Sequence, residues 1–260
     1  MASSGSGYDL SASTFSPDGR IFQVEYASKA VENAGTALGL KCRDGIILAV
    51  EKPLTNKMLL PSSSRRIHTV DTYSGLAITG FVSDGRQIVH RAREEASEYE
   101  ATYGASIPPS VLADRVAAYV HYFTLHGSLR PFGSTALLAS YDPEMESASL
   151  HMIEPSGTTF QYFACAAGKG RQPVKTEMEK LAPAKLGLSV REGVKELAKM
   201  VYGVQDEAKD KPFELEMSWV CKESDWKHVG VPKDILKESV DAAKRELEEE
   251  EDEDEEEMEE

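Results

Sequence analysis

Five consecutive apolar residues at positions 46–50, Ile-Ile-Leu-Ala-Val, constrain the fold of this chain more than any other feature. A strand with one face in solvent alternates apolar and polar residues, whereas a strand buried on both faces is apolar throughout. Residues 36–42 form another predicted strand, and the intervening Arg43-Asp44-Gly45 carries the Asp-Gly signal of a tight hairpin. We therefore expect a hairpin whose second strand is covered on both faces.

The predicted elements occur in groups along the chain. Strands at 36–42, 46–50, 66–70 and 75–79 precede helices at 84–103 and after Ser110, which can cap the second of them. Strands at 134–141, 149–153 and 158–165 precede helices ending near Leu181 and spanning 189–202, followed by a strand at 213–221 and a helix after Pro232. Such grouping predicts the α+β class, with two stacked antiparallel sheets between helical layers. No repeat or linker divides the body, so we expect one domain over residues 20–245.

The negative charge of the chain is concentrated at its end. The net charge is −15, and residues 246–260 contain thirteen acidic residues and no basic one, which leaves −2 for residues 1–245. Like charges repel, so we expect residues 246–260 to form a disordered, solvated acidic tail. A nearly neutral body disfavours nucleic acid as a partner, because phosphate contacts need clustered Lys and Arg.

Cysteine usage and hydropathy indicate an intracellular, soluble protein. The three cysteines, Cys42, Cys165 and Cys221, are isolated and lack metal-ligand spacing, which suits a reducing compartment. Residues 1–7 are small and polar, without the apolar stretch of a secretory signal. No run approaches the roughly 20 apolar residues of a membrane span. We expect no membrane association, no metal and no cofactor.

A turn and a helix are predicted near the start of the chain. Ser16-Pro17-Asp18-Gly19 suits a type I β-turn, because proline presets φ at its second position and glycine fits its fourth. A helix over about residues 20–33 follows, and Gly35 can end it in a left-handed conformation. Its apolar residues form two adjacent rows, Phe22, Tyr26 and Ala30, and Val24, Ala27 and Val31. On these residues alone, it is an amphipathic helix docked on a core.

The same segment carries a family resemblance. Tyr8-Asp9 and the run from Phe15 to Ala27, Phe-Ser-Pro-Asp-Gly-Arg-Ile-Phe-Gln-Val-Glu-Tyr-Ala, resemble the N-terminal signature of 20S proteasome alpha subunits. The variant Tyr8-Asp9-Leu10-Ser11 and the acidic C-terminus are most similar to the alpha type-3 class, the seventh position of the eukaryotic alpha ring. The resemblance implies a four-layer αββα sandwich, the N-terminal nucleophile hydrolase fold, with the helix across one end.

An active N-terminal threonine hydrolase is the alternative function, because beta subunits with this fold are threonine proteases. Their mature chains begin with Thr, which a carboxylate about sixteen residues on and a Lys about thirty-two on support. If Thr36 is aligned with the nucleophile, the carboxylate and Lys positions are occupied by Lys52 and His68. If Gly35 is aligned with the nucleophile instead, they are occupied by Glu51 and Ile67. Neither register supplies the required residues, and the helix occupies the segment that processing would remove. We therefore predict no catalytic residues.

The resemblance implies a gate made by the N-terminal tail, residues 1–19. In the family a heteroheptameric alpha ring is stacked on beta rings, and the alpha N-termini close the axial pore. Tyr8 and Asp9 match the gate pair, and Pro17 and Tyr26 match the residues that brace the open arrangement. Many alpha subunits have Arg after Tyr-Asp, whereas this chain has Leu10, so one charged gate contact is absent.

The resemblance also implies an activator-docking pocket, where a basic residue pairs with the carboxylate of an activator's C-terminal tail. The matching position is Arg66, with Gly80 nearby, and arginine keeps the charge. Ser28 stands where a further basic residue is sometimes found. The implied partners are other alpha and beta subunits and the regulatory particle or other activators. The implied role is gating and assembly in ubiquitin-dependent protein degradation, in cytoplasm and nucleus.

Overall fold

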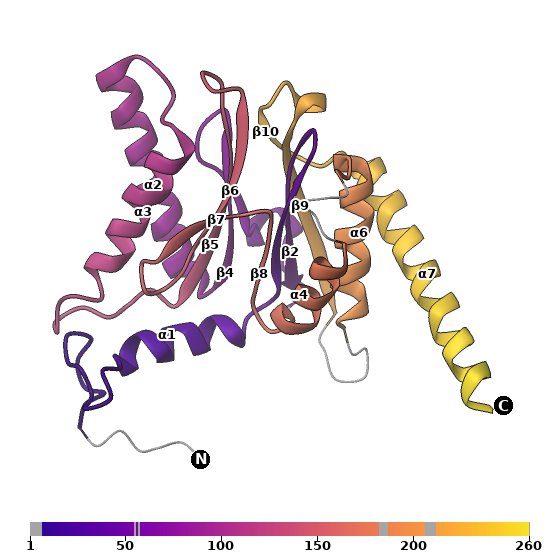
Figure 1. Cartoon of the computed structure of the whole chain (residues 1–260), viewed down its shortest axis with the longest axis horizontal. Helices are drawn as coiled ribbons and strands as arrows, with labels where there is room; N and C mark the ends of the chain where they lie inside the picture. The colour runs from indigo at the N-terminus through magenta and orange to yellow at the C-terminus, as the bar shows by residue number, and fades with distance from the viewer. Residues whose placement is uncertain (1–6, 55, 57, 182–186, 206–211, 260) are drawn as a thin grey trace.

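Two five-stranded antiparallel sheets form the middle of the molecule (Figure 1). The computed structural model describes residues 7–54, 56, 58–181, 187–205 and 212–259, with backbone alone at 61–62 and 250–259. The first sheet has the order β10 (His228–Gly230), β9 (Phe213–Cys221), β2 (Gly45–Pro53), β1 (Ala37–Cys42) and β8 (Ala164–Ala167). The second has the order β3 (Ile67–Thr69), β4 (Ser74–Gly80), β5 (Ser134–Asp142), β6 (Ser147–Ile153) and β7 (Thr159–Tyr162).

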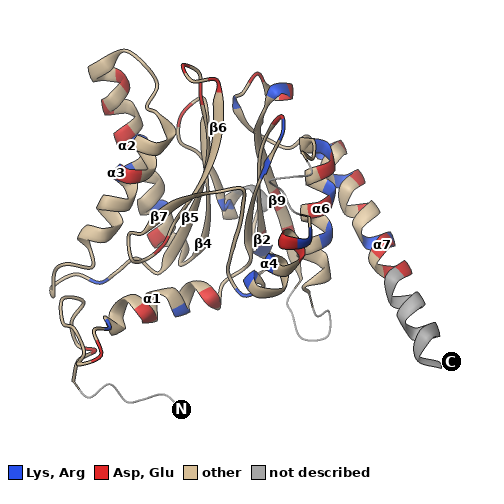
Figure 2. Ribbon diagram, in the orientation of Figure 1, with Lys and Arg blue, Asp and Glu red and all other residues tan. Residues whose placement is uncertain are grey.

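Helices cover the outer face of each sheet and one end of the stack (Figure 1). The second sheet carries α2 (Val82–Tyr103) and α3 (Pro109–Tyr122), the first carries α4 (Arg171–Lys180) and α6 (Val190–Gly203), and α7 (Lys233–Glu259) packs against α6. The remaining helix, α1 (Phe22–Glu32), lies across the end, and two short 3-10 helices are η1 (Pro61–Ser64) and η2 (Lys222–Ser224). This arrangement confirms the predicted four-layer αββα sandwich. Acidic and basic residues are interspersed along α2 and α6 (Figure 2).

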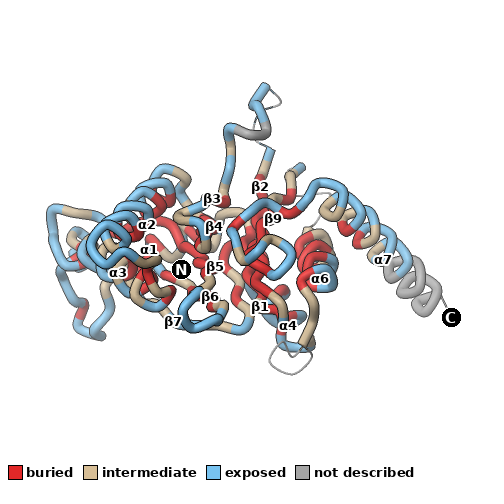
Figure 3. The backbone as a smooth tube through the Cα atoms, turned by 90° about the horizontal axis from the view of Figure 1, so that it is seen from above, coloured by how far each residue is buried: buried red, intermediate tan, exposed pale blue. Residues whose placement is uncertain are grey.

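The side chains of β2 explain why its sequence is continuously apolar. Ile46 and Leu48 belong to the core between the two sheets, and Ile47 and Ala49 belong to the core between the first sheet and its helices. All four are completely buried. A third core lies between the second sheet and α2 and α3, so buried residues follow the middle layers of the molecule (Figure 3). The expected burial of both faces of this strand is confirmed.

Residues 158–165, predicted as one strand, form two strands in different sheets. β7 ends at Tyr162 at the edge of the second sheet, and β8 begins at Ala164 at the edge of the first. Phe163 connects them, and 57% of its surface is exposed. The prediction was wrong because β-propensity depends on residue type, and it does not record which sheet a residue joins.

Two helix ends also differ from the sequence-based expectations. Ser110 does not cap α3, because the helix begins one residue earlier at Pro109, and prolines suit a first helical position where no backbone donor is needed. The acidic run does not end the last helix, since α7 continues to Glu259. Glutamate has high helix propensity, and extending an existing helix avoids the cost of nucleation. Residues 1–6 of the predicted N-terminal tail lie outside the described residues.

A buried histidine, His228, links the two sheets along the flank where their edge strands β3 and β10 lie. His228 Nε2 lies 2.9 Å from Ser218 Oγ in β9, and its Nδ1 lies 2.8 Å from Thr69 Oγ1 in β3. Its ring also fills the space that a Cβ at Gly75 would occupy, at 2.1 Å. Burial lowers the pKa of His228 from 6.5 to about 4, so the ring is neutral in the folded chain at physiological pH.

This burial predicts a loss of stability on acidification. Above pH 6.5 the His228 ring is neutral in both states, whereas between pH 6.5 and 4 the unfolded chain alone takes up its proton. We expect this residue to reduce the free energy of unfolding by about 2 kcal/mol between about pH 7.5 and pH 5. Urea denaturation of the wild type and of His228→Gln at both pH values measures the difference. Equal pH dependence in the two proteins would contradict the prediction.

Candidate functional site

The segment before α1 is held in a closed turn. The Gly19 amide donates to the Ser16 carbonyl at 2.9 Å, and the Ser16 amide donates to the Arg20 carbonyl at 2.9 Å. Gly19 has a φ of +74°, a backbone conformation that favours glycine. The predicted turn at these residues is confirmed. The helix that follows runs from Phe22 to Glu32, slightly shorter than expected.

The apolar face of α1 is only partly buried. Ala27 and Val31 are buried beneath the helix, whereas Tyr26 is 45% exposed and stacks on Phe22, with a centroid separation of 6.3 Å. The row of larger residues therefore faces the surface at this end of the sandwich. An apolar row left at the surface is available for contact with other chains.

The described part of the tail lies back against α1. Tyr26 Oη donates to Asp9 Oδ2 at 3.3 Å, and Gln23 Nε2 donates to the Asp9 carbonyl oxygen. Partial desolvation and the nearby Asp9 carboxylate raise the pKa of Tyr26, so its phenol remains a hydrogen-bond donor at neutral pH. Further along, Ala12 is only 1% exposed and anchors the tail.

Of the four residues assigned to the gate, the structure brings two into direct contact. Asp9 and Tyr26 meet, whereas no hydrogen bond or ring contact among the described residues joins Tyr8 or Pro17 to that pair. Tyr8 is exposed, and Pro17 is the exposed second residue of the turn. Gln23 was missed by the sequence reasoning, although its position one helical turn before Tyr26 placed it on the same face.

Arg66 and Gly80 line one small pocket of about 190 Å³ beside the C-terminal end of α1. The sequence-based prediction that they lie close together agrees with this geometry. Gly80 has a φ of +110°, and a Cβ there would lie 2.2 Å from the Gly133 carbonyl oxygen, so the wall requires glycine. Ser28 does not line this pocket; it lines a larger groove on the other side of α1.

The Arg66 side chain gives the pocket its positive charge. Its backbone amide donates to Glu216 Oε2 at 2.8 Å, but its buried Nε has no hydrogen-bond partner among the described residues. Burial lowers the pKa of Arg66, but a guanidinium stays protonated in proteins at neutral pH. A half-buried guanidinium can attract a carboxylate through its charge, which the nearby Glu216 carboxylate partly offsets.

Thr36, one of the two residues considered above as a hydrolase nucleophile, is buried and internal to the chain. Thr36 is 2% exposed, its backbone amide donates to Glu51 Oε2 at 2.9 Å, and its Oγ1 accepts from the Gly170 amide at 3.1 Å. Lys169 Nζ lies 3.3 Å from Glu51 Oε1. Because the Thr36 nitrogen is a peptide amide, it provides no free amine to act as a base.

Gly35 does not adopt the predicted left-handed helix end. Asn33 is the C-cap residue, and Gly35 is not among the described residues with positive φ. Glycine is needed here for a different reason. A Cβ at Gly35 would lie 2.5 Å from the Glu51 carbonyl oxygen, so the chain leaving α1 passes directly against β2.

Other catalytic or ligand-binding chemistry has little support in the described residues. No three His, Cys, Asp or Glu side chains gather there as ligands for a metal ion. Among the same residues, every helix is too short or too polar to cross a membrane. Burial raises the pKa of Cys42 and Cys165 to about 12, which keeps both thiols protonated and poorly nucleophilic.

Comparison with known proteins shows the family to which most of this chain is similar. Residues 8–30 match the family model of the N-terminal signature of A-type proteasome subunits, and residues 31–220 match the family "Proteasome subunit". An alpha type-3 proteasome subunit from Oryza sativa is 57% identical over 96% of this chain and 98% of its own length. Its counterpart of the same name from Arabidopsis thaliana is 54% identical over the same shares, and that from Drosophila melanogaster is 46% identical over 92% and 93%.

Proposed function

This chain belongs to the proteasome subunit family as an alpha-type member, and we propose that it is a non-catalytic subunit that gates the 20S core particle and docks its activators. Family membership implies assembly with other proteasome subunits. The proposed setting is a heteroheptameric alpha ring stacked on beta rings in cytoplasm and nucleus. There the subunit would control substrate entry during ubiquitin-dependent protein degradation.

The contact between Asp9 and Tyr26 carries the gating proposal. It joins a short tail to a helix that is fixed on the core through Ala27 and Val31. A hydrogen bond at an exposed site contributes about 1 kcal/mol, and Asp9 accepts one from Tyr26 and one from Gln23, so the tail can exchange between a docked and a released arrangement. Order–disorder switching of a short segment against a rigid element is an established way to gate a site.

We expect removal of the tail to open the pore of the assembled particle. Deleting residues 2–11 should raise peptide hydrolysis by activator-free particles, because the segment that spans the pore is gone. Tyr26→Phe removes the hydroxyl that donates to Asp9 and should change the same rate by about threefold to tenfold. Tyr122→Phe, at an exposed tyrosine on α3, is the control. Unchanged hydrolysis after the deletion would show that this subunit does not close the pore.

The buried, internal Thr36 supports a non-catalytic role. Its amide is committed to Glu51 and its hydroxyl to Gly170, and α1 and the tail precede it in the chain. A threonine hydrolase would need that preceding segment removed.

The intact mass of the chain in purified particles distinguishes the two functions. We expect a chain that begins at Met1 or Ala2, with α1 retained. Treatment with a covalent inhibitor of threonine proteases should leave this mass unchanged, while the catalytic beta subunits in the same sample gain the inhibitor mass. A chain that starts at Thr36, or that carries the inhibitor, would support the hydrolase instead.

The Arg66 pocket supports the docking proposal. An activator tail that ends in a carboxylate would meet the positive charge of the Arg66 guanidinium. Glu51 lines the same pocket, but its carboxylate already accepts from Thr36 and Lys169, which limits its repulsion of an incoming anion.

Substitution of Arg66 should reduce activator binding to this pocket. We expect Arg66→Ala to weaken binding of an activator C-terminal peptide by about tenfold, because a charge-assisted hydrogen bond contributes about 1.5–3 kcal/mol. Arg66→Lys should keep part of the affinity, since it retains charge but loses the planar fork. Arg245→Ala, at an exposed position on α7, should have no effect. Calorimetry on assembled particles measures all three, and equal affinities would exclude this pocket.

A further inference from the structure

The described part of the tail meets the loop between α3 and β5, residues 123–133 (Figure 1). A Cβ at Gly127 would lie 2.7 Å from Ser11 Oγ and 3.8 Å from Ser11 Cβ, so the tail passes directly beside the loop. Ser11 is also held within the tail, because its Oγ accepts from the Ser13 amide at 3.2 Å and lies 2.9 Å from Ser13 Oγ. The next residue, Ala12, is only 1% exposed. Residues 11–13 are therefore fixed against the rest of the chain.

The loop that contacts the tail is itself fixed by α2. Arg130 donates to both carboxylate oxygens of Asp84, from Nη1 at 2.6 Å and from Nη2 at 2.8 Å, and the Gly133 amide donates to Oδ2 at 2.9 Å. Asp84 is buried in the first turn of α2. The buried Phe132 packs on Phe123 with a centroid separation of 4.5 Å, which joins the two ends of the loop. Because a bidentate arginine–carboxylate pair fixes geometry, the loop offers the tail a rigid support.

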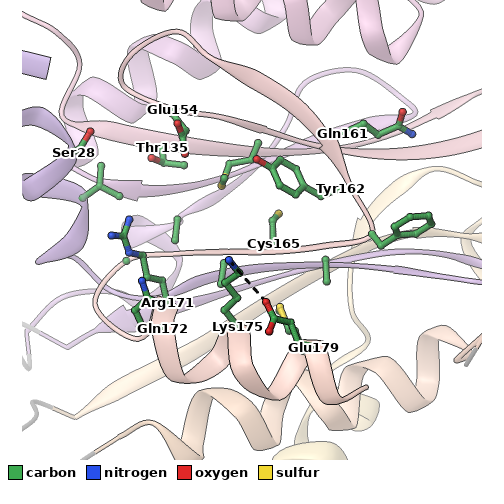
Figure 4. A pocket seen from close by; sticks show the side chains of 18 of the residues that line it. Ser28, Thr135, Glu154, Gln161, Tyr162, Cys165, Arg171, Gln172, Lys175 and Glu179 are labelled. Carbon is green, nitrogen blue, oxygen red and sulfur yellow. Dashed lines mark ion pairs between the residues drawn. The ribbon is translucent and has the colours of Figure 1, made fainter. Parts of the chain in front are cut away.

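The helix α1 beside the tail is fixed as well. Arg171 at the start of α4 pairs with Glu32 at the end of α1, at 2.7 Å. Arg171 and Ser28 lie at the same end of a groove of about 840 Å³ that α1, β8 and α4 border (Figure 4). Ala27 and Val31 are buried beneath α1. The helix is therefore held along its core face and at its last turn, so a moving tail moves relative to it.

The residues just before Ser11 are held more loosely. Tyr26 donates to Asp9 at an exposed site, where water competes for the hydrogen bond. Leu10, between Asp9 and Ser11, is 86% exposed. Local opening begins where buried contacts are few. The change from an exposed to a buried backbone thus falls between Leu10 and Ala12.

We propose that the α3–β5 loop anchors the gating tail through the contact between Gly127 and Ser11, and that opening of the gate releases Asp9 and Leu10 but leaves Ser11 in place. This inference rests on the proposed function and states where the moving part of the tail ends. Gly127 is then a positioning residue, because only the absence of a side chain lets Ser11 lie against the loop.

A disulfide between the two positions tests the contact directly. Disulfide-bonded cysteines have Cβ atoms about 3.5–4.5 Å apart, and a Cβ at residue 127 would lie 3.8 Å from that of Ser11. We expect Ser11→Cys with Gly127→Cys to crosslink in assembled particles treated with a mild oxidant, as detected by mass spectrometry of non-reduced digests. The native cysteines are buried and should not compete. Ser11→Cys with Gly230→Cys, at the opposite end of the sandwich (Figure 1), is the control and should not crosslink.

The crosslinked particle also shows where the moving part ends. Peptide hydrolysis is compared before and after reduction of the disulfide, with an activator present. We expect equal rates, because the residues that move precede the crosslink. A lower activator-stimulated rate in the oxidised particle would overturn the inference, since it would mean that Ser11 itself must move. Failure of the pair to crosslink would overturn it as well.

Displacing Ser11 should open the gate without an activator. We expect Gly127→Leu to raise activator-free hydrolysis by about threefold to tenfold, because the contacts that hold one residue are lost. In particles that also lack residues 2–11 it should add nothing, because Ser11 is gone, whereas a general loss of stability would still act there. Gly230→Leu is the matched control, at an exposed glycine where a Cβ would meet no atom closer than 3.9 Å.

The failure of this inference is distinguishable from that of the proposed function. If deleting residues 2–11 raises hydrolysis while Gly127→Leu keeps the wild-type rate, the anchor alone is wrong. If neither change raises hydrolysis, the gating role is wrong and the inference falls with it.

Discussion

The buried carboxylate of Glu51 determines where the functional end of this molecule is built. Glu51 is 3% exposed. Its carboxylate accepts a hydrogen bond from the Thr36 amide and forms an ion pair with the Lys169 ammonium. A buried carboxylate without partners is costly, so these contacts must form together. They join β2 to the first residues after α1 and to the loop before α4. The position of α1 follows from this junction, and with it the tail and the Arg66 pocket, which Glu51 also lines.

The fold was predictable where the pattern of apolar residues in a strand shows whether one or both of its faces are buried. β9 has the bounds that its alternating pattern predicted, residues 213–221, and the apolar run in β2 is buried on both sides. Prediction failed where the chain changes its surroundings within a few residues. Between Tyr162 and Ala164 the backbone leaves one sheet and enters the other, although every residue in that stretch suits a strand. The three-residue strand β10 was missed because so short a segment shows no period.

The site was predictable from the sequence only through the family motif. Arg66 and Gly80 were placed together by resemblance, and the structure puts both on the wall of one pocket. Lys169 was not identified, because it acts through a contact with a distant part of the chain; for Gln23 the spacing indicated the helix face that it shares with Tyr26 but not its contact with Asp9. Gln23 contacts Asp9 across the turn. Lys169, which follows the edge strand β8, contacts Glu51 in β2. Residue spacing carries no signal for such non-local contacts.

The distribution of exposed apolar residues connects the fold with assembly. A two-sheet sandwich has strand edges on two flanks, and helices cover its faces but not those edges. The edge strands are short, β3 and β10 with three residues and β7 and β8 with four, which limits unwanted strand pairing. Yet Phe160 and Phe163 on one flank and Met58 and Leu60 on the other remain exposed. In an isolated chain such surfaces favour aggregation, and exposed apolar patches often mark sites of contact with other chains. Apolar flanks of this kind are suited to contact with neighbouring chains, while α1 covers one end of the sandwich and holds the tail against it.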